Sequence, residues 1–557
     1  MKDKLFLADF NKYYNKKSCD SIVRKNELCI SYFPVYSIEN GIDWDANPFN
    51  SKTWEFHYHS LTWLYSYCYG IEQLKEEGLI DSLCRLIVGY FNYLANSVNK
   101  MAWFDHSVAC RSSVISYIYV VLNKRNCNYV CNMLSQQAKT HSISLCNYLN
   151  DEKFEKSNHR IFHAQALHDL SIVFNFQALI DKSIRIIQNT YKKLFCSESS
   201  LTTEQSSFYN LFNLHLLHQS NRYFSLHQVS IFDKYANFIK TAYQSLLMLT
   251  DINGFYIPYG DTSVLGPIES NYLEQIWSID KEKFLRDKSD QLDKVIDFHS
   301  FDFGLGLAQM KVLEKTTISL YYSAKKNRAA HGHYDSASFL LYFDGKPLVI
   351  EAGGPFGYGK QERYKYYMAE LGHSMPVIGL SNQHFFTQSC ERTRINDFFM
   401  VKLTSTSKSN KWVRSFLIFK CGVIAIIDDY LLEDNSQVTN KIIFSQEYTV
   451  STPSDFYRIL NEQKKCVCNL YLKLFCKENI NEIVSFETES ITTGLYKTLP
   501  SNSVCRKAVG KIFTQFAVFC LPDVSSRVIF LDCGFKILEE NREYLITNID
   551  GVSGIFL

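Results

Sequence analysis

The chain has 557 residues, of which 46% are hydrophobic and 21% are charged, a composition typical of a globular protein and not of a disordered one. A chain of this length exceeds one ordinary hydrophobic core, so two domains are expected. The formal net charge of +2 provides no general electrostatic attraction for nucleic acid, and a nucleic-acid partner is therefore not expected.

The N-terminal sequence and the cysteines bear on where the protein resides. The opening MKDKLFLADFNKYYNKK has no apolar core long enough for a signal peptide, and no stretch of about 18 uninterrupted apolar residues predicts a membrane span. The 17 cysteines are scattered and include no C-x-x-C pair, which favours free thiols in a reducing compartment. We therefore expect a cytoplasmic protein without a membrane span.

Apolar residues recur at helical spacing from about residue 57 to residue 290. Within 61–94, for example, Leu79, Leu83, Leu86, Tyr90 and Leu94 follow one another at intervals of three or four residues, and the glycines of this run punctuate the pattern without ending it. Short polar breaks separate similar runs at 107–122, 129–149, 161–195, 207–218 and 232–249. The pattern predicts a helical domain of stacked hairpins over residues 1–295.

The pattern changes near residue 295, within the charged segment 287–300. From residue 303 onward, runs such as TTISLYYSA, SASFLLYF and KPLVIEA are rich in β-branched and aromatic residues and are bounded by turn residues. So many strands with so few helices between them predict an antiparallel β-sandwich over residues 296–557. The expected fold class is therefore α+β, with two domains.

One stretch of the second half, HGHYDSASFLLYFDGKPLVIEAGG (residues 331–354), gathers ionisable side chains around a predicted hairpin. His331, His333 and Asp335 precede an apolar run, an Asp-Gly turn signal follows, and the next apolar run ends at Glu351. Such a cluster is either the solvated entry to a strand or part of a site. Two histidines and an aspartate so close together favour the site.

The same stretch resembles the central motif of the heparinase II/III-like family of polysaccharide lyases, in which H-x-H-x-D-x-x-S-F is followed by a strand, a glycine turn and a strand that ends in an acid. This chain has Glu351 where the family usually has aspartate, and only His373 matches the family's downstream His-Asn-Thr motif. Four more pieces match in the family's order: TWEFHYHSLTWL from Thr53, SNHRIFHAQAL from Ser157, EQSSFYNLF from Glu204 and GFYIPYGDTS from Gly254.

The resemblance implies an incomplete (α/α) toroid followed by a β-sandwich. It also implies β-elimination on an acidic, uronate-containing glycan. Because no signal peptide is expected, the candidate substrates are imported oligosaccharides and capsule or surface polysaccharides under synthesis. In that chemistry Asn158 would stabilise charge on the uronate carboxylate. His159 or His331 would act as base at C5, and Tyr209 would transfer a proton at the leaving O4 or, for one stereochemistry of C5, do both jobs. The structural alternatives are a helix N-cap for Asn158 and a core position for Tyr209.

Further residues resemble a substrate groove of the family. Trp54, His57 and His59 lie in its first motif, Trp103, His106 and Arg111 lie in MAWFDHSVACR, and Tyr366 lies in the tyrosine-rich segment ERYKYYMAELGHSMP. The first three are equally compatible with closing the first helix. The guanidinium of Arg111 suits either a uronate carboxylate or a structural bond to Asp105, and Tyr366 suits packing.

The resemblance also implies a divalent ion, structural and most simply zinc, at His333, Glu351 and His373, because two histidines and a carboxylate are a good ligand set for zinc. His331 would then face substrate and His333 would face the metal. Residues two apart in a regular strand point to the same side, so the backbone between these histidines must be irregular. Gly332 permits that irregularity.

Two other functions stay open from the sequence. One is a non-catalytic glycan-binding or capsule-assembly protein on the same fold, against which the presence of the four candidate catalytic residues argues. The other is a glycoside hydrolase on the helical toroid, which needs two carboxylates flanking the scissile bond. Asp105 and Asp261 are conceivable for that role, but no carboxylate pair stands out in the sequence.

Overall fold

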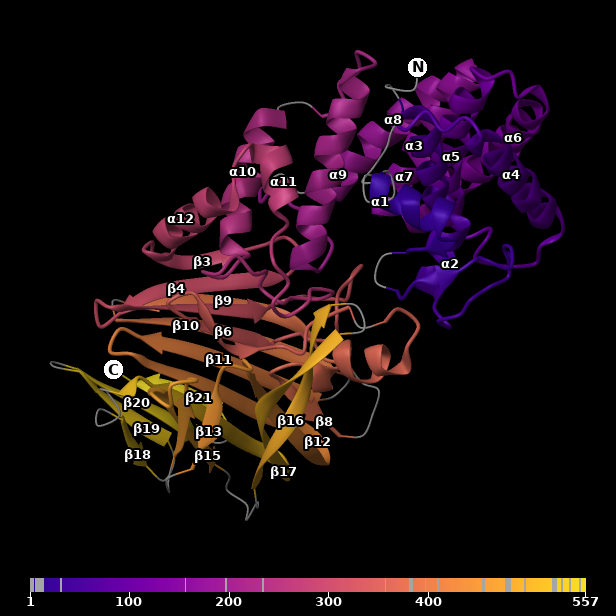
Figure 1. Cartoon of the computed structure of the whole chain (residues 1–557). Coiled ribbons are helices and arrows are strands. Elements are labelled where there is room, and N and C mark those ends of the chain that lie inside the picture. Colours follow the sequence, from indigo (N-terminus) through magenta and orange to yellow (C-terminus); the bar gives the residue numbers. More distant parts are fainter. Residues whose placement is uncertain are drawn as a thin grey trace. The chain divides into compact units, whose positions relative to one another are not determined.

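The structure is a computed structural model of the whole chain (Figure 1). It describes Leu5 and residues 15–30, 33–155, 157–195, 198–232, 235–355, 357–379, 384–395, 397–407, 410–452, 456–475, 482–494, 497–522, 528–531, 534–539, 542–549 and 552–556. The chain forms two compact units. The first, here the helical unit, comprises residues 1–197 and 212–238, and the second, here the β unit, comprises residues 198–211 and 239–557.

The helical unit contains helices and one short hairpin, visible in indigo and purple in Figure 1. Its elements are α1 (Lys16–Cys19), η3 (Asp20–Arg24), β1 (Glu27–Leu28), β2 (Tyr36–Ser37), α2 (Lys52–His59), η4 (Thr62–Leu64), α3 (Tyr65–Glu72), α4 (Leu79–Asn96), α5 (Asp105–Asn123), α6 (Asn128–Asn150), η5 (Glu152–Phe154), α7 (Asn158–Val173) and α8 (Gln177–Leu194). Helix α9 (Ser207–Ser225) has its first residues in the β unit and continues into the helical unit.

The helical unit has an inner and an outer set of helices, as burial along each helix shows. Helices α5 and α7 are buried on nearly every side. Helices α4 and α8 instead bury one stripe at a spacing of three or four residues, such as Leu83, Ile87, Tyr90 and Leu94 on α4. A one-sided stripe belongs to a helix that covers a core, and burial on all sides belongs to a helix inside it. The inner helices are therefore the ones that carry buried polar residues toward the centre of the unit.

Two of the predicted helical runs are interrupted in the structure. The run 161–195 divides into α7 and α8, because Asn175 adopts a left-handed backbone conformation with φ +57°. The run 61–94 divides into η4, α3 and α4, and Gly78 is the N-cap of α4. Apolar spacing persists across both breaks because the flanking helices bury the same kind of residue, so the spacing alone does not reveal a short connection.

Besides the start of α9 and the short helices η6 (Arg363–Tyr367) and η7 (Glu370–Gly372), the β unit contains three longer helices and most of the strands of the described chain. The helices are α10 (Tyr235–Met248), whose first turn belongs to the helical unit, α11 (Ser270–Trp277) and α12 (Lys281–Leu292). The strands of its large sheet are β3 (Ile296–Ser300), β4 (Leu305–Val312), β5 (Thr316–Ser323), β6 (Phe339–Phe343), β7 (Lys346–Ile350), β8 (Pro376–Ile378), β9 (Phe386–Ile395), β10 (Phe398–Ser407), β11 (Asn410–Phe419), β12 (Val423–Phe444), β13 (Thr449–Ser451), β14 (Tyr457–Leu460), β15 (Cys466–Phe475), β16 (Ile483–Gly494) and β17 (Lys497–Cys520).

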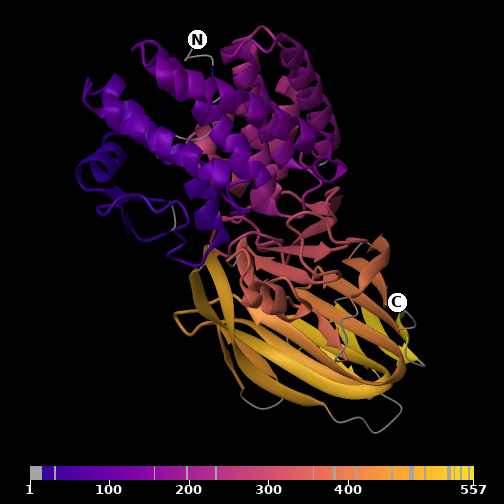
Figure 2. The ribbon, with the colours of Figure 1, turned by 90° about the vertical axis from the view of Figure 1, so that its right-hand side faces the viewer.

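The large sheet is antiparallel throughout its described pairings and runs in the order β13-β14-β15-β17-β12-β7-β6-β5-β4-β3, with further strands branching from this path. A second sheet joins β18 (Val528–Leu531), β19 (Gly534–Glu539), β20 (Arg542–Ile549) and β21 (Val552–Phe556). In Figures 1 and 2 the yellow strands of this second sheet form a layer beside the orange strands of the first. Aromatic contacts such as Tyr544 with Phe398 and Phe419 join the two layers.

Strands β4 to β7 are buried on both faces, which explains their nearly continuous apolar sequences. One face contributes to the large core of the sandwich, and the other packs on a smaller core with Leu201, Leu249, Ile257 and Tyr259. The segments around residues 201 and 257 therefore belong to the β unit by packing, although they precede its strands in the sequence. These two segments carry candidate site residues.

The predicted hairpin at residues 339–350 is confirmed. Strands β6 and β7 are joined by Asp344 and Gly345, whose φ values of +49° and +74° are both in the left-handed region. An Asp-Gly pair with two positive φ values is the preferred two-residue turn between antiparallel strands. Because of this turn, Glu351 at the end of β7 lies beside Ser338 at the start of β6, and the Ser338 hydroxyl donates a hydrogen bond to Glu351.

No helix in the part of the chain that the structure describes is long and apolar enough to cross a membrane.

Candidate active site

Three separate segments of the β unit meet at the start of α9. The backbone N–H groups of Gln205 and Asp261 donate to the carbonyl oxygens of Ala330 and His331, at 2.9 Å each. The first turn of α9 is capped by the 259–262 loop, since the N–H of Phe208 donates to the hydroxyl of Thr262 at 3.1 Å. These bonds bring together Tyr209, Asp261 and the histidine segment, which are far apart in the sequence.

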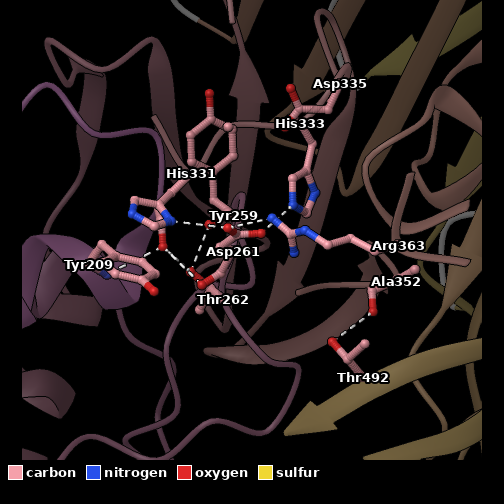
Figure 3. A network of polar contacts seen from close by, with 12 residues as sticks. Tyr209, Tyr259, Asp261, Thr262, His331, His333, Asp335, Ala352, Arg363 and Thr492 are labelled. Atoms are coloured by element: carbon pink, nitrogen blue, oxygen red, sulfur yellow. Dashed lines mark hydrogen bonds and ion pairs between the residues drawn. The ribbon is translucent and has the colours of Figure 1, made fainter. Parts of the chain in front are cut away.

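Asp261 lies at the centre of this arrangement, fully buried (Figure 3). Its Oδ2 accepts from Nδ1 of His331 at 3.0 Å and from the guanidinium of Arg363 at 2.7 Å, and its Oδ1 accepts from Nε2 of His333 at 3.0 Å. Burial alone would raise the pKa of Asp261, but the two histidine hydrogen bonds and the charge of Arg363 hold the pKa well below its usual range. The carboxylate is therefore a permanent anion that orients both histidines.

The orientation fixes which histidine nitrogen is available. A carboxylate oxygen only accepts hydrogen bonds, so Nδ1 of His331 and Nε2 of His333 carry the hydrogens. In the neutral rings this leaves a lone pair on Nε2 of His331, whose side chain is 21% exposed, and on Nδ1 of His333, which is buried without a hydrogen-bond partner. The Asp261 carboxylate thus leaves Nε2 of His331 able to accept a proton. It leaves Nδ1 of His333 able to bind a metal ion.

Tyr209 lies flat on His331, with ring centroids 3.4 Å apart and ring planes 13° from parallel. Its hydroxyl is 2.9 Å from that of Tyr358, which in turn donates to Asp261 at 3.4 Å. Burial and then the negative charge of Asp261 raise the pKa of Tyr209 above that of a free phenol. The phenol is therefore protonated at neutral pH and can donate its proton.

The backbone irregularity that the sequence requires lies at His331 itself and not at Gly332. His331 has φ +59°, in the left-handed region that non-glycine residues seldom adopt. Gly332 is needed for a different reason, because a Cβ there would come within 2.1 Å of Oε1 of Gln205. Residue 332 is thus restricted by close approach of the α9 segment, and residue 331 bears the unusual conformation.

The helical unit holds a second group of candidate residues at the start of α7. Ser157 is the N-cap, with its hydroxyl accepting from the N–H of His159, so Asn158 is not the N-cap that its sequence position suggests. The amide of Asn158 instead donates to Oδ1 of Asn213 at 3.0 Å. Asn213 is one turn after Tyr209 on α9, and residues at this spacing share a helix face.

Asp105 binds the second candidate histidine in the way that Asp261 binds the first. Its Oδ2 accepts from Nδ1 of His159 at 2.8 Å and from Nε2 of His163 at 3.0 Å. Burial would raise the pKa of Asp105, but these two bonds lower it. His159 is 35% exposed, and its Nε2 keeps the lone pair of the neutral ring. The bond to the Asp105 carboxylate also shows that Asp105 is not the partner of Arg111.

Arg111, proposed for substrate binding, is fully buried with its donors used inside the helical unit. They reach Nε2 of His141 at 2.9 Å, the carbonyls of His59 and Ala102 at 2.8 Å each, and the hydroxyl of Tyr90 at 3.0 Å. These bonds give Arg111 a structural role in this conformation. His59 is likewise buried, which lowers its pKa to about 4.

The remaining candidates for substrate binding differ in exposure. Trp54 is fully buried and stacks on Tyr58 with ring centroids 4.6 Å apart. His57 and Trp103 are partly exposed, and the ring of His106 lies 4.6 Å from that of His159. Tyr366 is partly buried and its hydroxyl donates to Glu489. Of this set, His57, Trp103, His106 and Tyr366 are partly exposed, and Trp54 is part of the core.

Two of the three predicted metal ligands, Glu351 and His373, converge with Asp335, which the sequence did not propose as a ligand, while the predicted ligand His333 lies beside this group. Single donor atoms of Asp335, Glu351 and His373 all lie within 4.8 Å of one another. The rings of His333 and His373 have centroids 5.4 Å apart. Both ring nitrogens of His373, Nδ1 of His333, both oxygens of Asp335 and Oε2 of Glu351 are buried without a well-formed hydrogen bond. Buried polar atoms are normally paired, so this donor set fits a divalent cation.

A positively charged side chain also enters this cluster. Lys325 forms an ion pair with Asp335, and both side chains are almost completely buried. Burial lowers the pKa of Lys325 to about 7, although the negative charge of Glu351 opposes that shift. His373 lies beside Glu351, with Nδ1 3.0 Å from Oε2. Burial would raise the pKa of Glu351, but the charge of His373 lowers it.

The sequence interpretation gave no role to Arg363, Tyr358, His163 or Lys325, and it considered Asp105 and Asp261 only as hydrolase carboxylates or, for Asp105, as a partner of Arg111. Arg363 and Tyr358 complete the surroundings of Asp261, Asp105 and His163 accompany His159, and Lys325 accompanies the candidate metal ligands. Asp261 lies in the GFYIPYGDTS segment, which the family resemblance singles out without a role for the aspartate. The other residues have no distinguishing sequence signal because each depends on contacts with a distant segment.

The features to compare with known proteins are the helical unit, the antiparallel sandwich and the tyrosine–histidine pair beside a buried carboxylate. Residues 306–415 match the family model described as heparinase II/III-like, C-terminal, which confirms the resemblance seen in the sequence. No sequence among the curated proteins matches this chain.

Solved structures of similar fold extend the likeness to nearly the whole chain. A heparinase III structure is similar with a TM-score of 0.72 at 14% identity, over 97% of this chain and 91% of that one. The heparan sulfate lyase HepC from Pedobacter heparinus follows with 0.60 at 13%, over 99% and 90%. The chondroitin AC lyase of Streptomyces coelicolor A3 has 0.52 at 8%, over 98% and 85%. The predicted fold class, an (α/α) toroid followed by a β-sandwich, is thereby confirmed.

Proposed function

We propose that this protein is a polysaccharide lyase that cleaves a uronate-containing glycan by β-elimination. The observation that carries the proposal is the stacking of Tyr209 on His331, whose Nδ1 is held by the buried Asp261. That arrangement supplies a protonated phenol and a histidine nitrogen with a lone pair on two side chains whose rings are stacked. The likeness to heparinase III and to heparan sulfate and chondroitin lyases supports the same reaction class.

The residues suit the three requirements of the elimination. The proton on C5 of a uronate is only weakly acidic while the neighbouring carboxylate keeps its charge, so the site must stabilise that charge, remove the proton and protonate the leaving O4. The amide of Asn158 is a donor for the carboxylate. His331 has an acceptor at Nε2 for the C5 proton, and Tyr209 has the proton for O4. His159, with Nδ1 held by Asp105, is a second base of the same kind.

Hydrolysis is disfavoured by the state of the two candidate carboxylates. A glycoside hydrolase needs one carboxylic acid that is protonated at working pH and a second that acts as base or nucleophile. Histidine hydrogen bonds hold the pKa of both Asp105 and Asp261 below the usual range, and both carboxylates are buried. Neither can be the acid. A purely glycan-binding protein would not require Tyr209 and His331 in contact with their proton-transfer atoms prepared.

The direct test is to incubate the purified protein with heparan sulfate, heparin, chondroitin sulfate and alginate and to follow the ultraviolet absorbance of the products. Elimination leaves a C4–C5 double bond that absorbs, whereas hydrolysis does not. We expect absorbance to rise with at least one of these acidic glycans. New reducing ends without absorbance would identify a hydrolase, and binding without any new ends would identify a glycan-binding protein.

Replacing Asn158 with alanine tests the role of its amide. We expect kcat to fall by roughly 10²–10³-fold with little change in KM, because a donor to developing charge acts mainly in the transition state. The amide of Asn158 donates to Asn213, so Asn213→Ala is the matched control for a lost structural bond. A rise in KM alone, or an equal loss in both variants, would make Asn158 a binding or structural residue.

We also propose that the cluster of His333, Asp335, Glu351 and His373 holds one structural divalent ion, with zinc the best fit to its nitrogen and carboxylate donors. The ion would tie β7 to the segment that follows η6 (Arg363–Tyr367) and η7 (Glu370–Gly372), because Glu351 and His373 lie on these two stretches. His333 fits the role of a ligand whose second nitrogen is held by a carboxylate, here Asp261. The chemistry at C5 and O4 does not require this ion.

His373→Ala should behave as metal removal does. We expect the wild-type protein to carry about one equivalent of metal, and we expect the variant to lose it and to unfold several degrees lower, since structural metal binding contributes directly to folding. Elemental analysis and thermal unfolding measure these effects. His384→Ala is the control, because His384 pairs with Glu370 outside the cluster. A metal-free wild type as stable as His373→Ala would contradict the proposal.

The proposed partner is thus an acidic polysaccharide or oligosaccharide. The described cysteines are all free thiols, which supports the proposal of a reducing compartment such as the cytoplasm. A substrate within such a compartment would be an imported oligosaccharide or a surface polysaccharide under synthesis, and an assay on defined oligosaccharides distinguishes these from long external chains.

A further inference from the structure

We infer that Lys325 competes with the divalent ion for Asp335, so that its ammonium group is the resident cation of the metal cluster until a metal displaces it. This inference rests on the metal site proposed above. It concerns how tightly that site binds, which the ligand set alone does not determine.

Each carboxylate of the cluster already has a nitrogen neighbour without a metal. Two buried carboxylates, Asp335 and Glu351, face two nitrogen bases, Lys325 and His373, in two pairs. An ammonium in direct contact with a carboxylate keeps its charge more readily than an isolated buried one. Each buried charge of an ion pair is stabilised mainly by the other charge. Separating Asp335 from Lys325 therefore costs folding stability unless another charge replaces the missing partner.

A divalent ion at this position would meet the ammonium at short range. The donor atoms of Asp335, Glu351 and His373 lie within 4.8 Å of one another, so an ion bound to two of them is close to the third. Lys325 is paired with that third ligand. Repulsion between two cations inside a protein is strong at such distances. The metal can therefore use Asp335 only after Lys325 has moved away from it.

The surroundings of Lys325 fix its backbone and place an aromatic ring beside its ammonium group. The carbonyl oxygen of Lys325 accepts from Ser336 and Thr387, and its Cα lies against Gly304. The ammonium is 5.3 Å from the ring centroid of Tyr259, and an aromatic face is a favourable neighbour for a cation. We expect a rotation of the side chain closer to Tyr259 to release Asp335 without movement of the backbone that follows β5.

The test is the affinity for Zn²⁺, measured by competition with a chromogenic chelator in the full-length protein. We expect Lys325→Met to bind Zn²⁺ more than about tenfold tighter than the wild type. Lys326→Met, at the exposed neighbouring position, should bind as the wild type does. Zinc taken up by the free thiols is measured with His373→Ala and subtracted. In the absence of metal, Lys325→Met should unfold at a lower temperature than the wild type and regain stability with Zn²⁺.

A double substitution shows whether Lys325 acts through Asp335 and does not depend on Lys325→Met folding without metal. Asp335→Asn and Lys325→Met/Asp335→Asn should bind Zn²⁺ equally, because the contested carboxylate is absent from both. Tighter binding by the double variant would overturn the inference. Equal affinity of the wild type and Lys325→Met would also overturn it while leaving the metal site intact. Binding no stronger than that of His373→Ala in every variant would overturn both the inference and the proposed metal site.

Discussion

Tyr209→Phe is expected to lower the rate of glycan cleavage by roughly 10³-fold while leaving the thermal midpoint almost unchanged, because a positioned proton-transfer group contributes about 10²–10⁴-fold. The substitution removes only the hydroxyl. The ring remains stacked on His331, and the hydroxyl's described partner, Tyr358, keeps its bond to Asp261. Since the pKa of Tyr209 is raised by burial, the lost function is that of an acid toward O4 and not that of a phenolate base.

A matched substitution separates chemistry from packing in this experiment. Tyr256→Phe removes a phenolic hydroxyl that is buried in the β unit without a side-chain partner among the candidate catalytic residues, and it should retain nearly full activity. Activity is measured by ultraviolet absorbance of the product, and folding by thermal unfolding. If Tyr209→Phe retained more than about a tenth of the wild-type rate, proton transfer in this chain would have to be assigned to another group.

The parts of the fold that depend on local sequence are predictable here, and the reason is physical. Helices α5 and α6 begin and end within two residues of the predicted runs 107–122 and 129–149, since the spacing of apolar residues reflects burial along a single helix. The Asp344-Gly345 turn is likewise local, because the residue types of the turn itself favour its two left-handed backbone conformations. Breaks such as Asn175 escape the same reasoning, as a single backbone rotation leaves the apolar spacing unchanged.

The candidate site is predictable in its motifs and not in its connections. The sequence predicts that His331 and His333 are site residues. It does not show that both bind Asp261, which precedes them by about seventy residues. Arg111 illustrates the opposite case. Its resemblance to a substrate-groove segment suggests a uronate carboxylate or Asp105 as partner, whereas the structure buries it among four other protein acceptors. Long-range polar contacts are satisfied by the tertiary fold, and residue type alone does not reveal them.

Asp261→Asn is expected to lower activity by about 10²–10⁴-fold and also to destabilise the β unit by roughly 3–5 kcal/mol. An amide has one acceptor oxygen where the carboxylate has two, and its nitrogen is a donor that faces other donors. Arg363 would lose its described carboxylate partner, and one of the two histidines would have to give up its present tautomer. We expect Asp261→Asn to lose more stability than a substitution of either histidine alone, because the Asp261 carboxylate binds both histidines.

The control for charge removal is Asp251→Asn. Asp251 is also a buried aspartate of the β unit, but it accepts only backbone N–H groups, from Asn253 and Phe255, and burial raises its pKa to about 6. An amide oxygen can accept these bonds equally well, so the substitution should change activity less than about twofold. Asp261→Glu keeps the anion and should recover part of the lost stability. We measure kcat and KM, urea unfolding and bound metal for all three variants. If kcat falls in Asp261→Asn but not in Asp261→Glu, the loss is due to the missing charge. If both variants are equally inactive, the loss is due to the altered geometry of the two histidines. Activity of Asp261→Asn close to that of Asp251→Asn would show that the buried carboxylate has no part in orienting His331.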